Sequence, residues 1–93
     1  MKVIIRESAT ADLDNIAAWI EKENPIAAAR VVVAIRDRVT FLETDALAHM
    51  GRPGTVAGTR ELIEYPYIIV YQVRDEQREV IVLSIVHGAQ KTP

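Results

Sequence analysis

The last third of the chain constrains the fold most strongly, because it contains three β-type runs separated by short turns. Runs rich in β-branched and aromatic side chains occupy Arg60–Tyr65, Tyr67–Arg74 and Glu79–His87. Only the charged turn Arg74–Arg78 separates the last two runs, and a turn this short predicts an antiparallel hairpin. The three runs therefore predict a three-stranded antiparallel meander.

The first quarter of the chain predicts a strand followed by a helix. The β-branched segment Lys2–Arg6 is typical of a short strand. We expect Ser8 or Thr10 to cap a helix that runs to about Glu23. Its apolar residues recur at the spacing that places one stripe toward a core, namely Leu13, Ile16, Ala17 and Ile20.

A second helix is expected over residues 25–43, because Asn24 can cap it and Pro25 suits its first position. Its inward stripe comprises Ala28, Val31, Val32, Ile35, Val39 and Leu42. So short a link makes the two helices an antiparallel hairpin. Residues 44–58 are rich in Gly and Pro and are predicted to form a loop. The elements together predict an α+β fold in the order β-α-α-β-β-β, with the helix hairpin packed on one mainly antiparallel sheet.

Length and composition limit the possible functions. A chain of 93 residues is expected to form a single domain over 1–93. It has no cysteine, no apolar run long enough to span a membrane and no signal-peptide pattern at its start, so we expect a soluble cytoplasmic protein. The two histidines, His49 and His87, do not form a metal-ligand pattern, and no cofactor is expected. The net charge of −2 disfavours a polyanion such as RNA as the target.

Several apolar residues exceed what one small core requires. Strict alternation along the last strand places Val80, Val82 and Val86 on the face away from Ile81, Leu83 and Ile85. On the helices, four large apolar side chains lie off the inward stripes, namely Trp19, Ile26, Val33 and Phe41. The loop or the tail could cover the sheet face, and single exposed apolar residues are normal. Alternatively, these residues bind a partner protein.

Cleavage of RNA without a metal is the enzymatic possibility that the residues allow. It requires a general base, a general acid and cations around the phosphate. His87 and Arg60 could contribute, with Lys91 nearby in the tail. The alternatives are a His87 satisfied by the backbone and an Arg60 that stabilises the loop.

Four motifs, in this order and spacing, resemble the RelE/ParE superfamily of bacterial type II toxins, and the ParE-like branch fits best. They are Gly51-Arg52, Gly58–Leu62, Pro66–Tyr71 and His87–Pro93. Thr92 departs from the pattern, because Trp is common at its position. The nuclease branch fits less well, since Ile68 follows Tyr67 where RelE-like nucleases usually carry Arg.

The resemblance implies a toxin that inhibits DNA gyrase without catalysis and that takes part in plasmid stabilisation. We expect Arg60, His87, Gln90 and Lys91 to contact the target. The resemblance also implies a ParD-like antitoxin. The toxin itself would then contact DNA only indirectly, through this antitoxin. The residues expected beneath this antitoxin are Trp19, Ile26, Val33, Phe41, Val82 and Val86. A ribosome-dependent mRNA endonuclease using Arg60 and His87, or a degenerate module that only binds an antitoxin, are the alternatives.

Overall fold

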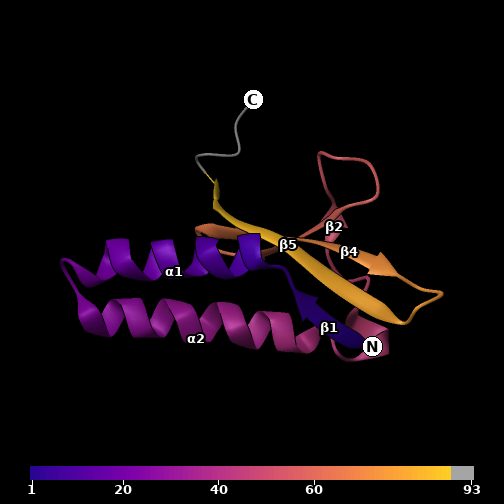
Figure 1. Cartoon of the computed structure of the whole chain (residues 1–93), viewed down its shortest axis with the longest axis horizontal. Helices are drawn as coiled ribbons and strands as arrows, with labels where there is room; N and C mark the ends of the chain where they lie inside the picture. Colours follow the sequence, from indigo (N-terminus) through magenta and orange to yellow (C-terminus); the bar gives the residue numbers. More distant parts are fainter. Residues whose placement is uncertain (89–93) are drawn as a thin grey trace.

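The computed structural model describes residues 1–88, in which two antiparallel helices lie against one sheet (Figure 1). The elements in chain order are β1 (Lys2–Ile5), α1 (Glu7–Glu21), α2 (Pro25–Phe41), the 3-10 helix η1 (Asp45–Leu47), β2 (Arg52–Pro53), β3 (Arg60–Glu64), β4 (Tyr67–Arg74) and β5 (Glu79–His87). The predicted α+β order is confirmed, and the predicted loop adds η1 and a two-residue strand.

The sheet has five strands in the order β1-β5-β4-β3-β2. Strands β2 to β5 pair antiparallel with their neighbours, while β1 runs parallel to β5. Strand β5 thus lies between β1 and β4, which confirms the prediction that residues 79–87 form an inner strand. The sheet brings the first and last described segments of the chain side by side.

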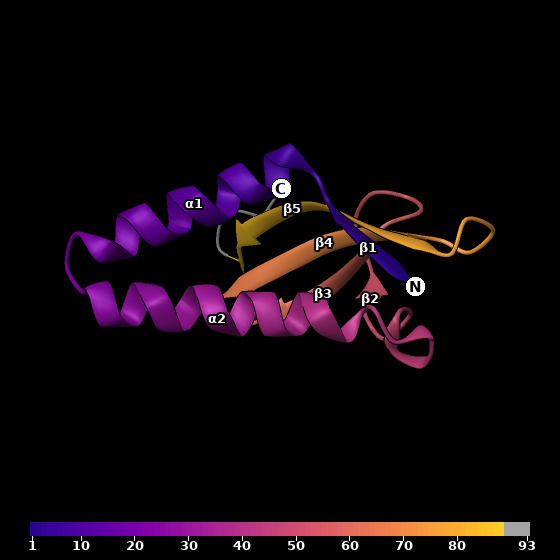
Figure 2. The ribbon, with the colours of Figure 1, turned by 60° about the horizontal axis from the view of Figure 1, so that its bottom comes forward.

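The helix hairpin covers one face of the sheet and extends beyond the sheet at the end where α1 and α2 are joined (Figures 1 and 2). The predicted inward stripes are confirmed. The core cluster on this face includes Leu13, Ile35, Val39, Leu42, Ile69, Tyr71, Val80 and Val82. Burial of these apolar side chains is the main favourable contribution to folding.

The two helices begin differently. At α2 the predicted cap is confirmed, because the Asn24 side-chain oxygen accepts a hydrogen bond from the Ala27 N–H at 3.0 Å. The predicted cap of α1 is wrong. That helix begins at Glu7, with Arg6 as the N-cap residue and no side-chain cap. Ser8 Oγ instead donates to the Leu83 carbonyl oxygen at 2.8 Å, so the serine links α1 to the sheet.

A β-bulge corrects the expected faces of the last strand. Val70 pairs with Ser84 and Tyr71 pairs with Val82, so Leu83 has no pairing residue on β4. The extra residue reverses the alternation. Ile85 therefore shares the side that faces the helices with Val80 and Val82. Both valines are 0% exposed, and the prediction that they lie on a free surface is wrong. Val86 pairs with Ile68 outside the core cluster and is half-buried.

Candidate functional site

Arg60 holds the segment that precedes β2. It begins β3 opposite Tyr71 and is half-buried. Its Nη1 donates to the carbonyl oxygens of His49 and Gly51, at 3.1 and 2.7 Å. A guanidinium bound to two carbonyl groups has fewer donors left for a phosphate or a partner. Of the two roles considered for Arg60, the structure shows the stabilising contact to the loop.

Tyr71 secures the same segment from the core. Its side chain is fully buried, and its hydroxyl oxygen accepts a hydrogen bond from the Gly51 N–H at 2.9 Å. Burial raises the pKa of the Tyr71 phenol above its ordinary value of 10.0, and the Gly51 hydrogen bond and the Arg60 charge offset this only in part. The phenol is therefore a neutral structural group.

His87 lies far from Arg60. It pairs with Tyr67 at the start of β4, and the two rings pack edge to face with centroids 5.5 Å apart. Because Arg60 lies opposite Tyr71, the two residues are separated by roughly 13 Å along β4 alone. A general acid–base group and a cation that act on one phosphate must converge within hydrogen-bond reach. Arg60 and His87 do not do so here.

The apolar residues predicted on the outer sides of the helices are exposed. The exposed fraction is 74% for Trp19, 67% for Ile26, 57% for Val33 and 45% for Phe41. Tyr65, which the sequence analysis did not single out, is 89% exposed in the turn between β3 and β4. Gln90 and Lys91 lie outside the described residues, so their predicted role stays a prediction.

A surface hollow of about 470 Å³ lies between α1 and the ends of β4 and β5. Its lining residues are Asp12, Asn15, Ile16, Trp19, Tyr67, Ile85 and His87. Asp12 Oδ2 accepts a hydrogen bond from the Ile85 N–H at 3.0 Å. Asp12 falls within the first predicted helix, and the sequence analysis gave it no role of its own. Its contact spans the whole fold, and no local sequence pattern could have indicated it.

Two kinds of site are absent from the part of the chain that the structure describes. No group of three or more His, Asp or Glu side chains in residues 1–88 could hold a metal ion. Within the same residues, neither helix combines the length and the apolar character needed to cross a membrane.

Comparison with known proteins identifies the family. The model of the family described as "ParE toxin of type II toxin-antitoxin system, parDE" matches residues 3–92. The chain therefore belongs to this family of toxins, as its motifs indicated. A curated protein of Sinorhizobium fredii (strain NBRC 101917 / NGR234), named "Putative toxin Y4kP", is 45% identical over 86 residues, which span 87% of this chain and 81% of that protein.

Two solved structures share the fold. The chromosomal ParDE toxin–antitoxin system from P. aeruginosa contains a chain that superposes with a TM-score of 0.81 at 29% identity, covering 94% of this chain and 95% of that one. The RelBE2 toxin–antitoxin complex from Mycobacterium tuberculosis contains a chain with a TM-score of 0.66 at 22% identity, covering 92% and 95%. The second likeness shows the fold alone.

Proposed function

We propose that this ParE-family toxin acts in the cytoplasm by binding DNA gyrase and blocking supercoiling, with no covalent chemistry of its own. The observation that carries the proposal is the wide separation of Arg60 and His87. In addition, the Arg60 guanidinium already donates hydrogen bonds to two carbonyl groups of the loop. A binder needs surface complementarity, whereas a nuclease needs convergent groups. The family match over residues 3–92 supports the same choice.

The partner that controls such a toxin is a ParD-like antitoxin. The P. aeruginosa structure is of a ParDE system, and 29% identity over 94% of this chain supports a similar partner here. In this proposal the toxin contacts DNA only indirectly, through the antitoxin. Its toxin-binding segment is disordered alone and folds on binding, as is common for segments that wrap a partner.

The exposed apolar side chains of the helix hairpin are the proposed antitoxin surface. Ile26 and Val33 are seven residues apart on α2, so they lie on the same side of the helix. An amphipathic helix of the antitoxin could bury both, with an extended segment over Trp19, Phe41 and Val86.

Purified gyrase tests the target. The 93-residue chain should inhibit supercoiling of relaxed plasmid, and addition of the antitoxin should restore it. Unaffected gyrase together with cleaved mRNA in a translating extract would identify a ribosome-dependent nuclease instead. In that case His87→Ala should reduce cleavage by roughly 10²–10⁴-fold. Failure to arrest growth when expressed alone would indicate a degenerate module.

Matched variants test the antitoxin surface. Val33→Ser should weaken antitoxin binding by about tenfold or more, since it removes a buried apolar contact from the complex. Val56→Ser is the control, because this valine is also exposed but lies in the loop between β2 and β3, and this variant should bind as the unchanged chain does. Equal affinity of both variants would place the antitoxin elsewhere.

A further inference from the structure

The hollow between α1 and the sheet combines one carboxylate, one amide and several ring faces. Four of its residues recur along one side of α1 at helical spacing, namely Asp12, Asn15, Ile16 and Trp19. The opposite wall is formed by Ile85 and by the edge-to-face pair of Tyr67 and His87. Oxygen acceptors and apolar surface therefore face one volume of about 470 Å³.

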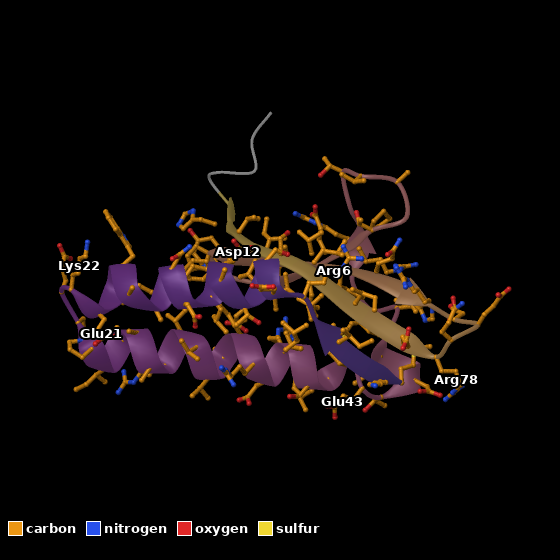
Figure 3. All side chains as sticks on the ribbon, viewed as in Figure 1. Arg6, Asp12, Glu21, Lys22, Glu43 and Arg78 are labelled. Atoms are coloured by element: carbon orange, nitrogen blue, oxygen red, sulfur yellow. The ribbon has the colours of Figure 1, made fainter. Side chains whose placement is uncertain are left out.

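A backbone hydrogen bond holds the carboxylate in place. Asp12 Oδ2 accepts the Ile85 N–H at 3.0 Å, which fixes the side chain against β5, and Figure 3 shows Asp12 on the side of α1 that faces this strand. Within residues 1–88 Asp12 forms no ion pair. Helix α1 contains no Lys or Arg, and its acidic residues are Glu7, Asp12, Asp14 and Glu21. The hollow is consequently complementary to a positive charge.

The indole of Trp19 already contacts one cation. Lys22 Nζ lies 5.6 Å from the centroid of the ring. Lys22 lines the neighbouring hollow toward the hairpin tip, of about 280 Å³, but not the hollow at Asp12. Trp19 lines both, so the indole stands between them. Its 74% exposure leaves ring surface available to a second cationic group.

We propose that this hollow binds an arginine side chain of a protein partner. A planar guanidinium can stack on the indole of Trp19 while it donates to Asp12, which an ammonium group does less well. The aliphatic stem of the arginine would lie on Ile16 and Ile85, and the Asn15 side-chain oxygen could accept a further N–H. The inference rests on the proposed function in one respect, since the antitoxin is the partner expected to supply the arginine.

A small probe tests the hollow without gyrase or antitoxin. N-acetyl-arginine amide, titrated into the full chain, should shift the NMR signals of the Trp19 indole N–H and the Ile85 amide in a saturable manner in the millimolar range. N-acetyl-citrulline amide has the same shape without the charge and should leave them unchanged. Equal shifts from both probes, or none from either, would overturn the proposal. The gyrase proposal would stand in that case, and failure of the gyrase assay would leave this result intact.

Three variants test whether Asp12 binds the arginine and whether the hollow is free for a partner. Asp12→Asn removes the charge but keeps an oxygen that can accept the Ile85 N–H, so the fold is preserved while probe binding should weaken about three- to tenfold. Asp14→Asn is the matched control, because it removes the same charge from the same helix outside the hollow, and an equal effect would contradict the proposal. The third variant, Lys91→Gln, tests whether the chain's own lysine occupies the hollow. If this variant binds the probe more tightly than the unchanged chain does, Lys91 is the occupant and the assignment to a partner is overturned.

Discussion

The carboxylate of Asp12 and the backbone N–H of Ile85, 73 residues apart in sequence, are joined by a hydrogen bond of 3.0 Å where β5 extends past β1. Ser8 satisfies the Leu83 carbonyl oxygen along the same edge. On the opposite edge of the sheet, Arg38 Nη2 donates to the Ile63 carbonyl oxygen at 2.9 Å, beyond the stretch of β3 that pairs with β2. Side chains of both helices thus satisfy exposed strand edges, which reduces their tendency to pair with other chains.

Removing the Asp12 acceptor should destabilise the fold. Asp12→Ala leaves the Ile85 N–H without its partner and should lower the free energy of unfolding by about 1–2 kcal/mol. Asp12→Asn retains an acceptor and should cost less. Urea denaturation measures both changes. Asp14→Ala, at an exposed position two residues along the helix, controls for helix propensity and should be close to neutral. A loss as large in Asp14→Ala would mean that the effect does not come from the strand edge.

An added methyl group at Gly51 should be poorly tolerated. A Cβ there would lie 2.6 Å from the Tyr71 hydroxyl oxygen and 2.7 Å from the Glu61 carbonyl oxygen, and the Glu61 oxygen is backbone and cannot move alone. Gly51→Ala should therefore destabilise the chain by about 2–4 kcal/mol. Thermal unfolding would detect this. A Cβ at Gly58 would meet only Gln72 Nε2, at an ordinary contact distance of 3.8 Å, but Gly58 has a φ of 84°, so Gly58→Ala should show a smaller cost of about 1 kcal/mol from backbone strain.

The helices and strands were predictable because apolar periodicity directly reflects which face is buried. Leu13 and Ile35 are buried on the stripes expected from their spacing, and the strand bounds at Tyr67 and His87 are those expected from the β-type runs. These features depend on neighbours within a few residues. They account for the fold class and for the inner position of β5.

What could not be predicted depends on contacts between distant residues. A period of two cannot show where an extra residue enters a strand, so the bulge at Leu83 and the burial of Val82 were missed. Two-residue β2 exists only because β3 lies beside it. Arg60 was expected to contact the target, whereas its contacts to His49 and Gly51 follow from the path of the loop. The hollow at Asp12 likewise requires α1 and β5 to meet.

Substitution of Arg60 should separate stability from function. Arg60→Ala removes two hydrogen bonds from a charged donor and should lower the free energy of unfolding by about 1.5–3 kcal/mol. Arg74→Ala, at the exposed end of β4, is the control and should change it by less than about 0.5 kcal/mol. Urea denaturation and growth arrest are measured for both. Unchanged stability with loss of toxicity in Arg60→Ala would instead assign Arg60 to the target surface.

Tyr71 should limit stability at alkaline pH. In the unfolded chain the phenol titrates at its ordinary pKa of 10.0, whereas burial raises the pKa in the folded chain. The stability that the neutral phenol contributes is therefore fully present below pH 10.0 and is lost as the pH rises toward the higher folded value. Tyr71→Phe should remove this alkaline loss, although it costs about 1–2 kcal/mol at neutral pH because the Gly51 N–H loses its acceptor. Urea midpoints across this range measure the slope, and Tyr65→Phe, at an exposed ring, should keep it.

Asp45 should contribute an acid-dependent part of the stability. The pKa of its carboxyl lies below the ordinary value of 3.8, first because the amino-terminal ammonium donates a hydrogen bond to it and second because Arg78 donates another. Arg78 lies near the end of the β4–β5 hairpin in Figure 3, so the carboxylate links η1 to that hairpin and to the chain start. Since the folded pKa is depressed, this stabilisation is fully present above pH 3.8 and is lost as the pH falls through the folded value.

Asp45→Asn should therefore lower the melting temperature at about pH 6 and have less effect at about pH 3, measured on untagged protein with a free amino terminus. Arg78→Gln should reproduce part of this difference, and Glu76→Gln, an exposed turn residue, should not. If Asp45→Asn behaves alike at both pH values, the ion pairs at Asp45 do not contribute to folding.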